Sequence, residues 1–266
     1  MGGLDTATVW NPKGMDRMAL YHFNAKIVKR SEGRSATQVA AYKLGQPIRC
    51  ERTGTKFNYT HGSRVTAFGI EAPIDAPDWI SDNEKLWNAV ELREVRKDAQ
   101  VLRDFEVALP FEVSAETHER MVKAFAQAIV EEFAVVVGWG IHAPREYSDQ
   151  RNIVAFLLLT TREVGKEGFT RKVREMSVRP TSISILERFR KLWADLINKE
   201  LDTAGLSERV DHRSLKARRS EALESGDNLE AGLLDREPQA RFSAVEHRKL
   251  KTELMVLEKE KARRSG

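Results

Sequence analysis

The chain has a single cysteine, Cys50, among its 266 residues. One thiol excludes an internal disulfide and any metal site built from several cysteines, so we interpret Cys50 as a passive thiol. The sequence also has no apolar run of the roughly 18 residues that a membrane-spanning helix needs, and its amino-terminus lacks a charged region followed by a hydrophobic one. We therefore expect a soluble, cytoplasmic protein without membrane insertion.

A strong excess of charge of one sign is also missing, because the formal net charge is only +4. Residues 166–266 carry 23 Lys and Arg against 18 Asp and Glu, whereas residues 1–165 carry 21 against 22. Evenly mixed charge is compatible with nucleic-acid binding but does not by itself indicate it. The first half is basic only locally, at Lys26, Lys29, Arg30 and Arg34.

Hydrophobic residues make up 41% of the chain, which suffices for a core. Alternating or β-branched patterns predict strands near 20–28, 104–109, 134–142 and 153–161. The last two are joined by a polar loop, which predicts an antiparallel hairpin at the centre of a sheet. Helical periodicity predicts helices at 36–44, 83–103 (capped by Ser81), 114–132 and 185–203. The predicted fold is α/β (α+β), with a central, largely antiparallel sheet flanked by helices.

Residues 18–45 combine a strand, a basic turn and a helix. Residues 21–28 alternate between hydrophobic and polar, and the sequence KRSEGR forms a turn around Gly33. Ser35 then caps an Ala-rich helix that carries Tyr42 on its last full turn. This arrangement would place a phenolic oxygen beside a loop that attracts phosphate.

The same stretch resembles the MobA/MobL family of plasmid mobilisation relaxases. The similarity lies in a Tyr-His-hydrophobic sequence, in S-x-G-x-S-A, and in a Tyr seven residues after Ser35, and it extends with gaps to about Phe242. Relaxases of this family nick one DNA strand at a transfer origin and stay linked to its 5′ phosphate through the Tyr. The resemblance therefore implies that Tyr42 is the nucleophile.

The resemblance also implies a domain layout. Residues 18–243 would form the relaxase domain, with the fold of a His-hydrophobic-His nuclease. Residues 1–17 are then a disordered leader, or follow from a start assigned upstream of Met18. Residues 244–266 are expected to form a charged helical tail.

In relaxases of this type, three histidines hold a divalent cation, Mg or Mn, that neutralises charge on the phosphate. The segments IHAP and NIVAFLLLTTR resemble the family pattern, so His142 matches the first ligand. Val154 and Phe156 stand where the paired histidines are expected, and another His is absent where LDREP continues as QARFS. Either metal-dependent nicking has been lost or the sequence contains local errors.

Asp104 and Glu106 match two acidic residues that the family carries on the strand before ALP. Alternate residues of a strand share a face, so these carboxylates would lie together and position a cation or a water. With His142 they would form a weak, oxygen-rich metal site. The predicted contacts to DNA phosphates are Lys26, Lys29, Arg30 and Arg34. His22 is read as a structural residue or a DNA contact, while Arg162, His212 and Arg213 match family positions without an assigned role.

Each candidate also has a plainer interpretation. Tyr42 would by default be a half-buried packing residue of an Ala-rich helix. His142 would be a hydrogen-bonded residue at the edge of the core. Asp104 and Glu106 would be a solvated strand face, and the basic residues an ordinary surface.

The function predicted from the resemblance is site- and strand-specific nicking and rejoining of DNA at an origin of transfer, through a 5′-phosphotyrosyl intermediate. The partners would be single-stranded and hairpin DNA, accessory mobilisation proteins and a coupling protein. One alternative is an impaired relative that binds or regulates the origin without cutting. Another is an interaction protein whose charged carboxyl-terminal helices bind a partner.

Overall fold

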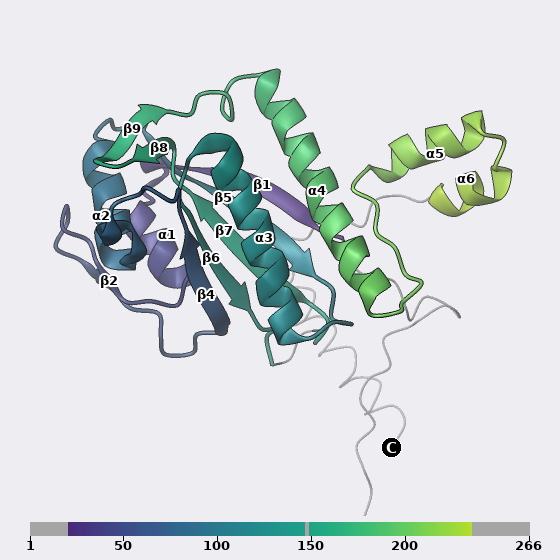
Figure 1. Cartoon of the computed structure of the whole chain (residues 1–266), viewed down its shortest axis with the longest axis horizontal. Coiled ribbons are helices and arrows are strands. Elements are labelled where there is room, and N and C mark those ends of the chain that lie inside the picture. Colours follow the sequence, from purple (N-terminus) through teal and green to yellow (C-terminus); the bar gives the residue numbers. More distant parts are fainter. Residues whose placement is uncertain (1–20, 147–148, 236–266) are drawn as a thin grey trace, which may run out of the picture. The chain divides into compact units, whose positions relative to one another are not determined.

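Figure 1 shows the computed structural model, which describes residues 21–146 and 149–235. Its centre is a five-stranded sheet with the strand order β1-β5-β7-β6-β4. The strands are β1 (Phe23–Lys29), β5 (Gln100–Leu109), β7 (Ile153–Leu159), β6 (Val137–His142) and β4 (Val65–Glu71). All neighbouring strands are antiparallel. The predicted antiparallel sheet is confirmed, and so is the β6–β7 hairpin, whose β7 is the central strand.

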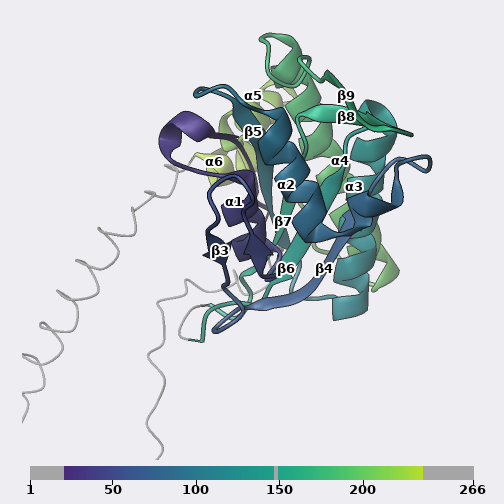
Figure 2. The same cartoon turned by 90° about the vertical axis from the view of Figure 1, so that its left-hand side faces the viewer.

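Two helices cover one face of this sheet, α1 (Ala36–Lys43) and α2 (Asn83–Arg93). Figure 2 shows both on the near side of the sheet. They pack through small and apolar residues onto Val28, Leu102 and Leu158 of the strands, with Trp87 of α2 fully buried. A small sheet of β2 (Ile48–Arg49) and β3 (Lys56–Phe57) and a 3-10 helix, η2 (Asp78–Ser81), lie in the connections of this layer.

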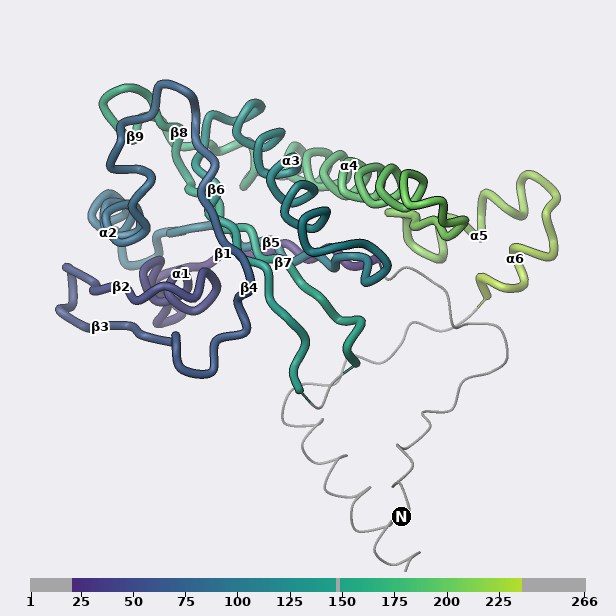
Figure 3. The backbone as a smooth tube through the Cα atoms, turned by 60° about the horizontal axis from the view of Figure 1, so that its bottom comes forward, coloured from purple at the N-terminus to yellow at the C-terminus, as the bar shows by residue number. Residues whose placement is uncertain are grey.

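The opposite face is covered by the long helices α3 (Ala115–Phe133) and α4 (Thr181–Thr203), as Figure 3 shows along the layers. Phe105 of β5 is buried in this layer, with its ring centroid 6.2 Å from that of Phe189 of α4. Phe125 of α3 packs against Trp193 of α4 with ring centroids 5.2 Å apart. Aromatic side chains of this size dominate core energetics, so this face forms the main hydrophobic core.

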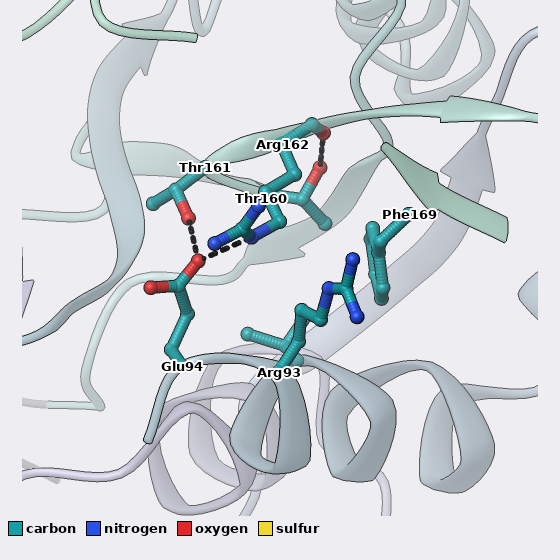
Figure 4. Close-up of a pocket in the computed structure, with 7 residues that line it drawn as sticks. Arg93, Glu94, Thr160, Thr161, Arg162 and Phe169 are labelled. Atoms are coloured by element: carbon teal, nitrogen blue, oxygen red, sulfur yellow. Dashed lines mark hydrogen bonds and ion pairs between the residues drawn. The ribbon is translucent and has the colours of Figure 1, made fainter. Parts of the chain in front are cut away.

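A second hairpin, β8 (Arg162–Gly165) and β9 (Gly168–Lys172), is attached to the end of α2. Glu94 accepts hydrogen bonds from Arg162 Nε at 2.7 Å, Lys172 Nζ at 2.8 Å and Thr161 Oγ1 at 3.2 Å. Figure 4 shows Glu94, Thr161 and Arg162 beside a small hollow lined also by Phe169. Arg162, for which the sequence suggested no role, therefore holds the hairpin to the helix.

The structure corrects the prediction of one helix over residues 83–103. Asp82, not Ser81, caps α2, and the helix ends at Arg93 because Glu94 turns away to bind Arg162 and Lys172. The chain then enters β5 at Gln100. This early end frees Asp104 and Glu106 to lie well inside a strand.

The described residues from 213 to 235 belong to a second compact unit. Its described part contains α5 (Leu215–Glu224) and α6 (Asn228–Leu234), which begin at the capping residues Ser214 and Asp227. The predicted leader at 1–17 and charged tail at 244–266 lie outside the described residues. Among the described helices, none is both long and apolar enough to cross a membrane.

Candidate active site

The local sequence explains how α1 is placed. After β1 the chain forms a 3-10 helix, η1 (Arg30–Glu32), and Gly33 takes φ 70°, a conformation that favours glycine. Ser35 caps α1, because its Oγ accepts a hydrogen bond from the Gln38 amide at 3.1 Å. The predicted strand, turn, cap and helix are confirmed, and they place Tyr42 on the last turn of α1.

Tyr42 projects from that turn with 46% of its surface exposed. Its ring meets the ring of Tyr59 edge-on at a centroid distance of 5.5 Å and lies 6.2 Å from the ring of His142. The side chain is therefore held by neighbours and still open to solvent. A nucleophile for a substrate as large as DNA needs both properties.

His142, at the end of β6, is tied to the carboxyl end of α1. Its Nε2 donates a hydrogen bond to the Lys43 carbonyl oxygen at 2.8 Å, one of the carbonyls that a helix end leaves without an intrahelical partner. Burial lowers the pKa of His142, an effect that the hydrogen bond partly opposes. The imidazole is therefore neutral at neutral pH, with its Nε2 proton committed to Lys43.

Two glycines of β6 allow α1 and α2 to approach the sheet closely. A Cβ at position 140 would collide with the Lys43 carbonyl oxygen, and a Cβ at position 138 would lie 3.0 Å from the Trp87 ring. Gly140 thus permits the contact between helix end and strand on which the His142 hydrogen bond depends.

Lys43 reaches the sheet beneath the helix. Its ammonium binds both carboxylate oxygens of Asp104, at 2.7 Å and 2.5 Å, and lies 3.8 Å from the centroid of the Phe156 ring. The side chains of the pair are only 10% and 3% exposed. Burial lowers the pKa of the Lys43 ammonium and raises that of the Asp104 carboxyl, and their mutual attraction opposes both shifts.

Glu106 lies on the same face of β5, two residues beyond Asp104. Its carboxylate is 3.7 Å from Nζ of Lys26, in the middle of β1, and 4.0 Å from Nε2 of His22, just before that strand. At the carboxyl end of α1 the structure thus links Tyr42 to His142 through their rings, and His142 and Asp104 to Lys43 through hydrogen bonds. The two carboxylates differ in their surroundings, since Asp104 is buried and Glu106 is half-buried.

The four basic residues predicted to bind DNA have different surroundings. Lys29 and Arg34 are exposed on the turn between β1 and α1, and Lys26 is exposed beside Glu106. Arg30 instead points toward α2, where it pairs with Glu91 at 2.8 Å and donates to the Glu94 carbonyl at 2.7 Å. Its visible role is to anchor the turn, while the DNA role of all four stays a prediction.

Residues 34–226 match the model of the MobA/MobL family. The chain belongs to the MobA/MobL family. The match covers α1 and four of the five strands of the main sheet, all but β1. It therefore includes the elements that carry Tyr42, Lys43, Asp104 and His142.

Individual relatives agree with the family match. The mobilization protein MobL of Acidithiobacillus ferridurans is 32% identical over 231 residues, which cover 77% of this chain and 60% of MobL. The conjugal transfer protein TraA of Rhizobium radiobacter is 30% identical over 276 residues, which cover 93% of this chain and 24% of TraA. The chain thus spans only part of the length of these relatives.

A solved structure described as the molecular basis of vancomycin resistance transfer in Staphylococcus aureus has the same fold. It superposes with a TM-score of 0.65 at 30% identity, and the alignment covers 74% of this chain and all of that one. The fold of this MobA/MobL chain is therefore that of a solved protein named for its part in resistance transfer.

The metal site implied by the family resemblance does not fit the residues of this MobA/MobL chain. On β7, Val154 pairs with His142 and Phe156 pairs with Gly140, so both side chains lie on the α1 face, yet neither can bind a metal. Asp104 is engaged by Lys43. In the part of the chain that the structure describes, no three His, Cys, Asp or Glu side chains form a metal-binding group. His142, Asp104 and Glu106 therefore do not form a metal-binding group among the described residues, and a cation held by them stays a prediction.

Sequence reasoning missed Lys43. A signal was present, because Lys43 follows Val39 and Ala40 by four and three residues and so lies on the buried side of a short helix. A lysine in that position must find an anion, and Asp104 is its partner. The structure also places His212 3.5 Å from Glu187 and pairs Arg213 with Glu221, and these contacts account for both as structural residues.

Proposed function

We propose that this chain is the relaxase part of a plasmid mobilisation protein, which nicks and rejoins one DNA strand at an origin of transfer. The observation that carries the proposal is the position of Tyr42, an exposed phenol on the last turn of α1 whose ring lies beside that of His142. Membership of the MobA/MobL family and the names of the relatives support DNA transfer as the setting.

The reaction is a transesterification at a phosphodiester. Tyr42 Oη attacks the phosphorus in line, the bond between phosphorus and the 3′ oxygen breaks, and the 5′ phosphate stays bound to the tyrosine. The phenol proton leaves to solvent, and the departing 3′ oxygen takes up a proton. Attack by a 3′ hydroxyl on the phosphotyrosine reverses these steps and rejoins the strand. The phosphotyrosine linkage therefore preserves the energy of the cleaved phosphodiester bond for the rejoining step.

The surface around Tyr42 suits a single strand of DNA. The exposed side chains of Lys26, Lys29 and Arg34 would bind phosphates on one side of α1. Phe68 of β4 is 47% exposed and pairs across strands with Gly140, so its ring lies on the α1 face and offers a surface on which a base can stack. Accessory mobilisation proteins and a coupling protein remain predicted partners.

A covalent-capture assay tests the proposal. Purified protein is incubated with supercoiled plasmids that carry the DNA flanking its own gene, and the mixture is denatured with detergent. We expect a relaxed plasmid with protein on the 5′ end, mapped by mass spectrometry to Tyr42, and no adduct with Tyr42→Phe. A Tyr59→Phe variant is the matched control. An adduct at another residue, or none in any buffer, would contradict the proposal.

A second candidate function is recognition of origin DNA without cleavage. It is favoured by Val154 and Phe156, which replace the ligand pair implied by the resemblance. A protein of this kind would shift a hairpin oligonucleotide from the origin region in a gel and yield no adduct with Mg²⁺, with Mn²⁺ or with chelator. Binding with a covalent adduct in any of these buffers excludes it.

A further inference from the structure

Lys43, the residue after Tyr42 on α1, places an ammonium against Asp104 on the α1 face of the sheet. We propose that the Lys43 ammonium is the resident cation of this active site, and that it supplies the positive charge beside the scissile phosphate in place of a divalent metal. This inference rests on the proposed function. It predicts strand transfer that does not depend on a metal ion.

The surroundings of Lys43 Nζ are those that an ammonium requires. Both oxygens of Asp104 lie within hydrogen-bond distance, and the Phe156 ring presents its face at 3.8 Å. A carboxylate and an aromatic face both attract a cation, and the aromatic contact strengthens where water is excluded. An ammonium has three N–H donors and makes two contacts to Asp104, so in this proposal a phosphate oxygen that reaches the largely buried Nζ would accept from the third donor.

The residues on β7 fit this arrangement and oppose a metal. Phe156 cannot ligate a metal, but its ring forms one wall of the Lys43 site. The same ring packs edge-on against the His142 ring at a centroid distance of 4.8 Å. Val154 is the cross-strand neighbour of His142 and adds no ligand. The two substitutions relative to the family pattern therefore leave a site that accepts an ammonium.

His142 acts in this scheme as a positioning residue. Its Nε2 holds the Lys43 carbonyl, so the backbone of the residue that carries the cation is fixed to β6. Tyr42 directly precedes Lys43 on the same helical turn. The nucleophile and the cation are thus placed by one hydrogen bond between a strand and a helix end.

Manganese titration tests the site without any DNA cleavage. Wild-type protein is titrated calorimetrically with Mn²⁺ alone, beside Lys43→Met and the triple variant Lys43→Met, Val154→His, Phe156→His. We expect no stoichiometric binding to the wild type and one Mn²⁺ per chain for the triple variant. One Mn²⁺ bound by the wild type and lost in Asp104→Asn would overturn the inference.

Cleavage kinetics test the role of the charge. The rate of adduct formation is measured with excess chelator and with Mn²⁺ for wild type, Lys43→Met and Lys43→Arg, with the exposed Lys85→Met as control. We expect a wild-type rate that chelator leaves unchanged, a loss of about 100-fold in Lys43→Met, and partial rescue by Lys43→Arg. Since Lys43→Met leaves Asp104 buried without a partner, Lys43→Met with Asp104→Asn is measured as well, and thermal melts verify that each variant is folded.

The outcomes separate this inference from the proposed function. Cleavage only with added Mn²⁺, or a folded Lys43→Met variant with the wild-type rate, overturns the inference and leaves the relaxase function standing. If the wild type cuts in no buffer, the proposed function fails, and the charge role fails with it. In that case the Mn²⁺ titration alone tests whether Lys43 excludes a divalent cation from this site.

Discussion

Glu91 of α2 accepts a hydrogen bond from the backbone amide of Ala36, the first residue of α1, at 2.5 Å. The same buried carboxylate pairs with Arg30 at 2.8 Å and with Arg52 at 3.0 Å. A carboxylate at a helix amino-terminus is also favoured by the helix dipole. One side chain therefore joins the basic turn, the start of α1 and the loop after β2, and so helps to fix the helix that carries Tyr42.

Replacing Glu91 by alanine is expected to lower the free energy of unfolding by about 3 kcal/mol, because it leaves the partly buried Arg30 without its charge partner. Urea denaturation measures the change. The exposed Glu131 of α3 provides the control, and its alanine variant should stay within about 0.5 kcal/mol of wild type. Equal stability of the two variants would show that the Glu91 network does not hold the turn.

Gly140→Ala tests the close approach of α1 to β6. The new Cβ would meet the Lys43 carbonyl oxygen, so the helix end must move, and overpacking of this kind costs about 1 to 3 kcal/mol. We expect lower stability together with loss of adduct formation at Tyr42. Gly165→Ala is the matched control, since its Cβ would meet only Thr170 at an ordinary 3.8 Å. A variant at 140 with wild-type stability and cleavage would refute the importance of this contact.

The salt dependence of DNA binding distinguishes the basic residues. Lys29→Ala and Arg34→Ala should each reduce the slope of log affinity against log salt by about 0.7, the value for one contact to a single-stranded phosphate. Arg30→Ala should mainly lower stability, because Arg30 binds Glu91 and the Glu94 carbonyl. Fluorescence anisotropy with a labelled hairpin carrying a single-stranded tail measures the slopes. Unchanged slopes for Lys29 and Arg34 would place the DNA elsewhere.

Acid stability should depend on Glu94. Burial alone would raise the pKa of Glu94, but the hydrogen bonds and charges of Lys172 and Arg162 hold it below its ordinary 4.5. Because the folded-state pKa is lowered, the Glu94 carboxylate contributes its full stabilisation at pH values above 4.5. This contribution is lost as the pH falls through the lower folded-state pKa. The stability gap between wild type and Glu94→Gln should therefore close in acid. The exposed Glu167→Gln is the control, and a gap that persists unchanged in acid would contradict the assignment.

The part of the fold that the sequence predicts well is governed by local signals. Ser35, Gly33 and the alternation in residues 21–28 act over a few residues, so the strand, turn and helix around Tyr42 are predicted correctly. The end of α2 is different. Glu94 leaves the helix to bind Arg162 and Lys172, and Arg30 takes its carbonyl, so contacts from distant segments override the helical periodicity.

The candidate site divides in a similar way. The family resemblance implied Tyr42, Asp104, Glu106 and His142 as site residues, and the structure places Tyr42 beside His142 and joins His142 and Asp104 through Lys43. The resemblance could not show that Lys43 contacts Asp104 and Phe156, because Lys43 is distant in sequence from both. Absent ligands are visible in a sequence, whereas a side chain that takes their place is visible only after folding.

Tyr42 and Lys43 are consecutive residues of one short helix, and successive helical residues are rotated by about 100°. Deletion of a single residue within α1 would turn the phenol to the buried direction of Ala41 and the ammonium to the exposed direction of Tyr42, so both groups would be misplaced in one step. The placement of both groups therefore depends on the register of α1 as well as on the identity of its residues.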